Sequence, residues 1–332
     1  MRILITGGTG FIGSHTAVNI LFKNHELFVL DNYSNSSEEV LDKIKTITKK
    51  DFFSETCDIR EKSKLIKIFS VFNPEIVIHF AGLKAVNESI KKPLNYYANN
   101  IAGTINLLEV MEQFNCNKII FSSSATVYGN PIYSPCDEKH QISPINPYGR
   151  SKYFIEEIIK DWTLSRDENK SVILRYFNPV GAHKSGIIGE LPKGIPNNLF
   201  PFILGVILKK YKYLSIYGND YDTIDGTGVR DYVHVEDIAM AHVNSLDLLN
   251  TFTKNQIINL GTGIGYSVLD IIKEFEKVIE TKIPFKIKTR RVGDAAIVVA
   301  DNKKAKSLLR WNIKNNLNDI CKDTIKWMNN YG

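Results

Sequence analysis

Two groups of residues, far apart along the chain, have the types and spacing needed for chemistry on a hydroxyl-bearing carbon. Tyr148 and Lys152 stand four positions apart, so a helix places them on one face, where an ammonium can stabilise a phenolate. Near the start, the segment TGGTGFIG (residues 6–13) follows an apolar run and opens a helical pattern. Such a glycine-rich turn binds phosphate through backbone N–H groups. Together the two groups predict a nicotinamide enzyme that moves a proton and a hydride.

The glycine turn predicts where a dinucleotide lies. Gly7, Gly10 and Gly13 provide a tight turn, a close approach of the backbone to the pyrophosphate, and close packing of helix on strand. Asp31 ends the second strand, where a carboxylate accepts hydrogen bonds from the adenosine ribose. Because a carboxylate there repels a 2′-phosphate, we expect NAD rather than NADP. Asp58 ends a third strand region and is expected to accept from the adenine amino group.

Two further segments complete the expected site. The residues 80–82 (Phe-Ala-Gly) end the fourth strand with little bulk, which lets the cofactor lie against backbone, and a helix capped by Asn99 is expected next. The run 118–124 ends in three serines at the carboxyl edge of the sheet, where ligands of open α/β sheets bind, and Ser124 is the candidate to orient the reacting hydroxyl. Lys152 and a positive nicotinamide ring are expected to bring the pKa of Tyr148 toward neutrality. No GxSxG motif or Ser, His, Asp set frames these serines, which disfavours a serine hydrolase.

The elements that position these residues alternate between strand and helix. Apolar runs predict strands at 2–6, 26–30, 76–80, 118–122 and 172–176, joined by helices at 11–23, 63–72, 99–114 and 148–165. This is the pattern of a Rossmann-like, doubly wound parallel sheet, so the fold class is α/β. We predict an NAD-binding domain over residues 1–177 and a smaller α/β substrate lobe over 178–332, from which some segments return to the first domain. Within the lobe, strands are expected at 214–217, 257–260 and 285–290, and helices at 234–249 and 268–280.

Composition excludes several classes. The 332 residues are 43% hydrophobic and 23% charged, which is ordinary for a globular protein. No leader precedes the glycine turn and no apolar run approaches the roughly 20 residues of a membrane span, so we expect a cytoplasmic protein that does not bind a membrane. Four scattered cysteines without a CxxC motif suggest neither a disulfide framework nor a metal site. The net charge of +6 comes from scattered lysines, which we attribute to compositional bias rather than to a nucleic-acid face.

A series of longer motifs identifies the relationship. TGGTGFIG, HFAGLKAV, SSSATVYG, NPYGRSK, LRYFNPVGAH, GIPNNL, GTGVRDYVHVED and RRVGD occur in order from residue 2 to about residue 311. They resemble the extended short-chain dehydrogenase/reductase family and, within it, the UDP-glucose 4-epimerases. The resemblance implies Ser124, Tyr148 and Lys152 as the catalytic residues, which also contact the cofactor. It implies an NAD site lined by Gly7, Gly10, Phe11, Ile12, Gly13, Asp31, Asn32, Asp58, Ile59, Phe80, Ala81, Gly82, Lys84, Asn99 and Phe177. It implies that Asn178, Asn198, Leu199, Tyr217, Arg230, Arg291 and Asp294 hold the UDP-sugar, where the two arginines can grip a diphosphate.

The same resemblance implies a mechanism and an assembly. Tyr148 takes the proton of the sugar 4-hydroxyl while hydride leaves C4 for the nicotinamide; the 4-keto sugar turns over, and hydride and proton return to give UDP-glucose from UDP-galactose, or the reverse. A homodimer is implied, through helices 99–114 and 148–165 of each subunit. His79 and His234, flanked by apolar residues, are expected to be structural.

Rival functions remain on the same fold. A sugar-nucleotide 4,6-dehydratase would carry Asp-Glu where Ala125 and Thr126 stand, and a uronate epimerase or decarboxylase would need further charged groups at the sugar end. A non-catalytic NAD-binding protein commonly lacks the tyrosine or the lysine, and both are present here.

One position departs from the family pattern. Val298 stands where relatives restricted to plain hexoses have tyrosine, which predicts room for UDP-N-acetylhexosamines beside the sugar C2. In the alternative, Ile297 or a shifted backbone refills that space.

Overall fold

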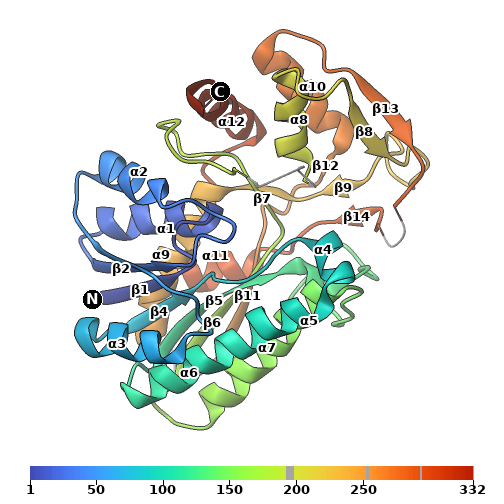
Figure 1. The fold of residues 1–332 in the computed structure, drawn as a ribbon. Helices are drawn as coiled ribbons and strands as arrows, with labels where there is room; N and C mark the ends of the chain where they lie inside the picture. Colours follow the sequence, from blue (N-terminus) through green and yellow to red (C-terminus); the bar gives the residue numbers. More distant parts are fainter. Residues whose placement is uncertain (192–197, 252–253, 292–293, 332) are drawn as a thin grey trace.

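The chain folds around one large parallel sheet, seen at the centre of Figure 1. The structure is a computed structural model, and it describes residues 1–191, 198–251, 254–291 and 294–331. Seven strands pair in parallel in the order β11-β6-β5-β4-β1-β2-β3. Their bounds are β1 (Arg2–Thr6), β2 (Glu26–Asp31), β3 (Phe53–Thr56), β4 (Ile76–His79), β5 (Lys118–Ser124), β6 (Lys170–Tyr176) and β11 (Gln256–Leu260). The strand order reverses between β1 and β4, and ligands of such sheets bind in the crevice outside the carboxyl ends at that point.

Helices cover both faces of this sheet, which confirms the doubly wound fold. Along β1, Ile3 and Ile5 face one core and Leu4 the other, because successive strand residues point to opposite sides. The first core includes side chains of α1 (Phe11–Phe22), α2 (Glu39–Thr48), α9 (Val235–Thr251) and α11 (Lys303–Leu309), and the second includes those of α3 (Lys62–Phe72), α6 (Gly103–Gln113) and α7 (Pro147–Leu164). Burial on both faces explains why the central strands are apolar throughout.

A smaller lobe lies beyond the carboxyl edge of the sheet, in the upper part of Figure 1. Its core is formed by α8 (Leu199–Ile207), α10 (Val268–Ile279) and α12 (Leu317–Tyr331). Its short strands pair as β7 (Asn178–Val180) with β10 (Tyr232–His234), β9 (Val229–Arg230) with both β12 (Tyr266–Ser267) and β14 (Ile297–Val298), and β8 (Leu214–Tyr217) with β13 (Phe285–Lys288). A reciprocal cap between Ser267 and Asp270 starts α10.

Two segments predicted within the smaller lobe lie on the large sheet, and one helix starts earlier than predicted. The strand predicted at 257–260 is β11, an edge strand of the large sheet, paired with β6, and the helix predicted at 234–249 is α9, which packs on the first core. The helix predicted to be capped by Asn99 starts earlier, because Pro93 occupies the first position of α5 (Pro93–Tyr96). The helical path continues through the π-helix η1 (Tyr97–Ala102), which contains Asn99, into α6. Asn99 is therefore an internal residue of this path and caps nothing.

Several elements had no prediction, among them α2, α11, α12, the 3-10 helix η2 (Ala125–Tyr128), α4 (Val86–Lys91) and the short strands β7, β9, β10, β12 and β14. The apolar run after residue 198 forms α8. Within the described ranges, no helix combines the length and the apolar character that crossing a membrane requires.

Candidate active site

The glycine turn after β1 is built so closely that side chains are excluded from it. Gly7 has a φ of +70°, and a Cβ there would lie 2.6 Å from the amide nitrogen of Ala81 at the end of β4. A Cβ on Gly13 would lie 2.3 Å from the carbonyl oxygen of Gly7. Gly10 is the N-cap of α1, whose first turn contains no acidic residue. The free N–H groups of that turn, with the positive end of the helix dipole, suit an anion such as a pyrophosphate.

Packing of their side chains fixes the first residues of α1. The Phe11 ring packs edge-on against His15, 5.4 Å between centroids, and Ile12 packs against the first core. Their side chains thus support the turn, while their backbone N–H groups belong to it.

Carboxylates follow β2 and β3, as predicted. Asp31 is buried and accepts from the backbone N–H of Thr9 at 3.1 Å and of Tyr33 at 2.9 Å, so its carboxylate is held beside the glycine turn. Asp58 accepts from Asn32 Nδ2 at 2.8 Å, which joins two predicted NAD residues.

Arg60, which the sequence analysis missed, forms an ion pair with Asp58 through two hydrogen bonds. Its Nε and Nη2 lie 2.8 and 2.7 Å from the two carboxylate oxygens. Hydrogen bonding from Arg60 lowers the pKa of Asp58 to about 2, against the opposing effect of burial. Ile59 is 3% exposed and faces Gly103 of α6, so its side chain belongs to the core.

The segment after β4 is fastened by another residue that the sequence analysis missed. Ala81 N donates to Thr6 O at 3.1 Å and Phe80 N to the same oxygen at 2.9 Å. The buried Asn100 accepts from Leu83 N at 2.8 Å and donates to Leu83 O at 3.0 Å and to Ser151 Oγ at 3.1 Å. Gly82 lies against the same amide. Asn100 thus ties this segment to α7, from the turn of π-helix that also holds Asn99.

Tyr148 lies in the first turn of α7, where Pro147 takes the first position and the Asn146 side chain accepts from Gly149 N. The Ser124 hydroxyl, at the end of β5, accepts from Thr126 N at 3.2 Å and from Thr126 Oγ1 at 3.0 Å. Burial of the phenol raises the pKa of Tyr148, while the Ser124 hydroxyl and the charge of Lys84 lower it, and burial prevails.

Lys152 lies one turn after Tyr148 on α7. Its ammonium donates to the carbonyl of Ser122 at 2.7 Å and lies 6.0 Å from the centre of the Tyr148 ring. Burial lowers the pKa of Lys152 to about 8, although Glu156 opposes this.

A buried polar network, also missed by the sequence analysis, supports α7. Arg175 of β6 donates from Nε and Nη2 to the two oxygens of Glu156, at 3.0 and 2.6 Å, and from Nη1 to the Tyr128 hydroxyl at 3.0 Å. Tyr128 in turn donates to Asn259 of β11 at 2.7 Å. The network thus connects α7 with β6, η2 and β11.

Four of the predicted substrate residues form two pairs in the smaller lobe. Arg230 Nη2 lies 3.5 Å from Asp294 Oδ1. The Arg291 guanidinium stacks over the Tyr217 ring at 4.0 Å. Each pair unites residues that are more than sixty positions apart, and each presents a guanidinium for anion recognition.

The remaining substrate residues lie at element ends. Asn178 begins β7, and its N–H donates to Asp231 O at 3.0 Å. Asn198 precedes Leu199 at the start of α8 and makes no side-chain cap. Parts of two motifs, residues 194–197 of GIPNNL and residues 292–293 of RRVGD, lie outside the described residues.

Val298 connects the two halves of the site. It is paired in register with Arg230 in the parallel strands β14 and β9. It also packs against a buried cluster that includes Ala125 and Phe177. The neighbouring Ile297 is 39% exposed. Because adjacent strand residues point to opposite faces, Ile297 does not fill the space beside Val298.

The expected structural histidines are enclosed. His79 is fully buried, with its ring nitrogens 2.6 Å from Thr6 Oγ1 and 2.9 Å from Thr104 Oγ1, and burial lowers its pKa to about 3. His234 Nε2 lies 3.3 Å from Asp323 Oδ2. The four cysteines are free and buried. Across the described ranges, no group of three or more His, Cys, Asp or Glu is placed to hold a metal ion.

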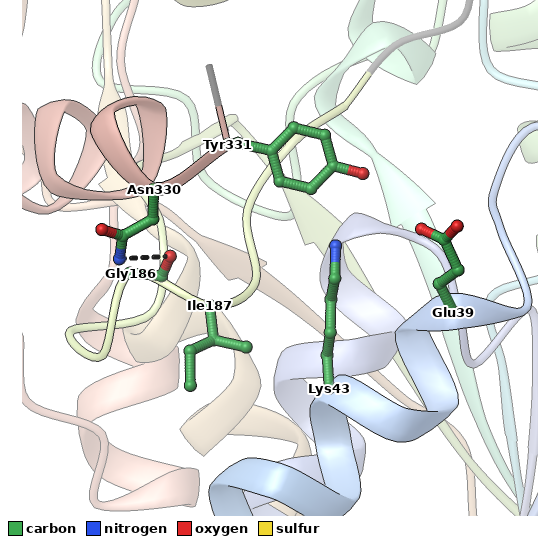
Figure 2. Close-up of a pocket in the computed structure, with 6 residues that line it drawn as sticks. All are labelled: Glu39, Lys43, Gly186, Ile187, Asn330 and Tyr331. Carbon is green, nitrogen blue, oxygen red and sulfur yellow. Dashed lines mark hydrogen bonds between the residues drawn. The ribbon is translucent and has the colours of Figure 1, made fainter.

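An open cleft of about 350 Å³ lies elsewhere, between α2 and the end of α12 (Figure 2). The Lys43 ammonium lies 4.1 Å from the centre of the Tyr331 ring, and Asn330 Nδ2 donates to Gly186 O at 3.1 Å. No predicted site residue lines this cleft. Its contacts join the two halves of the molecule, and we assign it no ligand.

Comparison with known proteins decides the family. A family model described as GDP-mannose 4,6 dehydratase matches residues 4–324. The UDP-glucose 4-epimerase of Bacillus subtilis (strain 168) is 49% identical over 98% of this chain and 96% of its own length. The chain belongs to the UDP-glucose 4-epimerase family. The resemblance inferred from the motifs is thereby confirmed.

Solved structures of this family agree with the fold. The UDP-glucose 4-epimerase from Bifidobacterium longum, in complex with NAD+ and UDP, superposes with a TM-score of 0.95 at 46% identity, covering 99% of this chain and 98% of that one. The UDP-Glc/GlcNAc 4-epimerase from Campylobacter jejuni gives a TM-score of 0.87 at 37% identity, covering 99% of both chains.

Proposed function

We propose that this chain is an NAD-dependent 4-epimerase that interconverts UDP-galactose and UDP-glucose. The observation that carries the proposal is the placement of Tyr148 in the first turn of α7, with Lys152 one turn on and hydrogen-bonded to β5, the strand that ends in Ser124. The names of the relatives support it, as does the NAD+ and UDP in the Bifidobacterium longum complex.

The protein's own geometry fits the cofactor. The turn at Gly7 and Gly13 leaves no space for side chains, and the N–H groups at the start of α1 suit the pyrophosphate. Asp31 is placed to accept from the adenosine ribose. NAD, when bound, supplies the hydride acceptor and donor for the sugar C4.

The side chains account for the proton and for orientation. Tyr148 as phenolate accepts the proton of the 4-hydroxyl and later returns it, while Ser124 orients that hydroxyl. Lys152, whose ammonium donates to the carbonyl of Ser122, adds positive charge 6.0 Å from the centre of the Tyr148 ring. Arg230 and Arg291 hold the diphosphate, which leaves the hexose free to turn and present its other face.

The dehydratase alternative is disfavoured at η2. Ala125 carries no acid, and the Thr126 hydroxyl donates to Ser124 Oγ at 3.0 Å. These are the positions where elimination of water would need an Asp-Glu pair. The alternative of a non-catalytic NAD-binding protein is disfavoured because Tyr148 and Lys152 are both in place.

The proposal extends to UDP-N-acetylhexosamines. Val298 stands where plain-hexose relatives carry tyrosine, and the neighbouring Ile297 is 39% exposed and points to the other face of β14. The name of the Campylobacter jejuni relative, a UDP-Glc/GlcNAc 4-epimerase, supports this extension.

We also propose a cytoplasmic homodimer formed through α6, η1 and α7. Leu94, Ile105 and Phe154 are 78%, 40% and 44% exposed on these helices or just before them, and the Tyr97 and Phe154 rings lie tilted to each other with centroids 6.3 Å apart. Large apolar side chains gathered on adjacent helices favour a four-helix interface. Light scattering should give twice the chain mass, and Phe154→Glu should give the monomer.

One assay tests the main proposal. Purified protein incubated with UDP-galactose, without added reductant, should form UDP-glucose, and bound NAD should remain after turnover. Stoichiometric NADH or a stable oxidised sugar product would instead indicate a dehydrogenase.

A further inference from the structure

One buried carboxylate joins separate parts of the chain beside the residues proposed to hold the UDP-sugar. Asp231 is fully buried. Its Oδ1 accepts from Thr262 N and from Thr262 Oγ1, both at 2.7 Å. Its Oδ2 accepts from Gly263 N at 2.9 Å and from Ala300 N at 3.1 Å. The two oxygens of a carboxylate offer about four acceptor sites, so these four neutral donors fill them.

The backbone of Asp231 lies where two small sheets meet. β9 ends at the preceding residue, Arg230, and β10 begins at the following residue, Tyr232. Asp231 N donates to Val298 O in β14 at 3.1 Å, and Asp231 O accepts from Asn178 N in β7 at 3.0 Å. Three residues that we propose for the sugar side of the site, Asn178, Arg230 and Val298, are thus joined through one residue.

The carboxylate ties this junction to the large sheet. The loop 261–263 follows β11, the edge strand that pairs with β6. Leu260, the last residue of β11, accepts from the backbone N–H of Phe177 at 3.0 Å, and we propose that Phe177 lines the NAD site. A Cβ on Gly261 would lie 2.6 Å from Asp231 Oδ2, so the loop is in close contact with the carboxylate. Asp231 therefore sets the sugar-side residues relative to the sheet that carries the cofactor site.

We propose that Asp231 is a positioning residue for the nucleotide sugar: its carboxylate fixes the backbone that carries Arg230 and Val298, and so places the guanidinium that binds the diphosphate. The inference rests on the proposed function. A carboxylate suits this role because it only accepts hydrogen bonds, whereas an amide of the same shape would turn an NH2 group toward two of the four donors. The Arg230 guanidinium donates to Val229 O at 2.9 Å and lies 3.5 Å from Asp294, so its position follows that of the local backbone.

The test is the affinity of the NAD-loaded protein for UDP in Asp231→Asn, which keeps the size of the side chain and leaves two donors without an acceptor. Calorimetric titration should give a Kd roughly tenfold higher than in wild type, within the about 10²-fold that a small misplacement of binding groups can cost. The KM for UDP-galactose should rise by a similar factor. The kcat should fall less and NAD should stay bound, because Tyr148 and Ser124 lie on other elements, α7 and β5.

A double variant separates positioning from general loosening of the lobe. In Arg230→Met the diphosphate contact is already lost, so adding Asp231→Asn should raise the Kd of UDP by a clearly smaller factor than it does in wild type. Equal factors in the two backgrounds would overturn the proposal. Thr262→Val removes one hydroxyl donor to the carboxylate and should raise the Kd less than Asp231→Asn does. It carries the test if Asp231→Asn does not fold, and an unchanged Kd there would equally overturn the proposal.

A matched control is Asp237→Asn, in the first turn of α9. Asp237 is also buried, and its two oxygens accept from the backbone N–H groups of Lys314 and Asn315, each at 3.2 Å. This variant should lower Tm and leave the Kd of UDP unchanged. If Asp231→Asn likewise lowered only Tm, or if both variants raised the Kd equally, the proposal would be overturned. If wild type bound UDP but lacked epimerase activity, the proposed function alone would fail, and the Kd comparison would still decide the role of Asp231.

Discussion

The ammonium nitrogen of Lys152 lies 2.7 Å from the carbonyl oxygen of Ser122, which links the catalytic helix to the strand that ends in Ser124. The lysine is only 5% exposed. Burial of the charge lowers the pKa of Lys152 to about 8, against the opposing charge of Glu156. The cation that we propose for the reaction is therefore held at a cost in stability.

That cost predicts a pH dependence of unfolding. Between a pH of about 8 and the ordinary lysine pKa of 10.5, the unfolded chain keeps the Lys152 proton and the folded chain loses it, so stability rises with pH. The full shift corresponds to roughly 3 kcal/mol. Urea unfolding across this window should therefore show a gain in wild type that is absent in Lys152→Met. Lys160→Met, an exposed lysine on the same helix, should keep the gain. Identical pH dependence in wild type and Lys152→Met would refute the assignment.

Removing the Tyr148 hydroxyl should stop proton transfer without disturbing the cofactor site. Tyr148→Phe is expected to lower kcat by at least about 10²-fold, the usual worth of a general acid/base, while bound NAD is retained. Tyr153→Phe makes the same chemical change on the same helix and should leave kcat near wild type. Near-normal turnover in Tyr148→Phe would remove the tyrosine from the mechanism.

The sequence predicted the parts of the site that sit in local patterns. The glycine turn, Asp31 and the Tyr148-Lys152 spacing are each readable within a few residues, because strand, turn and helix follow one another directly. Asn100 and Arg175 carry no such pattern. Their partners lie elsewhere along the chain, and only folding brings them together.

The sheet that a strand joins cannot be predicted from the strand's own sequence. The strand at 257–260 was predicted correctly as a strand, but an apolar run does not say which sheet it joins, and it pairs with β6. The burial of Lys152 and its hydrogen bond to Ser122 are likewise properties of the packed structure.

Breaking the buried pair between Glu156 and Arg175 should destabilise the fold strongly. Glu156→Gln leaves the Arg175 charge, which is 3% exposed, without its counter-ion. A loss of about 3–5 kcal/mol in the free energy of unfolding is expected, as for other buried pairs that lose one member. Glu157→Gln, next to it but exposed and paired only loosely with Lys160 at 3.7 Å, should change stability by less than about 1 kcal/mol. Equal effects in the two variants, measured by urea unfolding, would show that the network adds little.

Val298 is expected to set which sugars are accepted. Val298 is paired in register with Arg230, which we propose binds the diphosphate, and packs beside the cluster that includes Phe177, which we propose lines the cofactor site. An isopropyl group there leaves room that a tyrosine would fill, and a pocket with spare volume cannot strongly reject a larger substrate. Wild type should therefore convert UDP-N-acetylgalactosamine with a kcat/KM within roughly 10²-fold of that for UDP-galactose.

The substitution Val298→Tyr should reduce kcat/KM for the N-acetylated sugar and leave that for UDP-galactose nearly unchanged, because the ring would occupy only the space beside C2. Ile297→Tyr adds the same bulk one residue earlier, on the 39% exposed face of β14, and should leave the ratio as in wild type. The gatekeeper role is lost if wild type already discriminates by more than about 10²-fold, or if Val298→Tyr leaves the ratio unchanged. A ratio altered equally by both tyrosines would point instead to a general distortion of β14, since the two side chains lie on opposite faces of the strand.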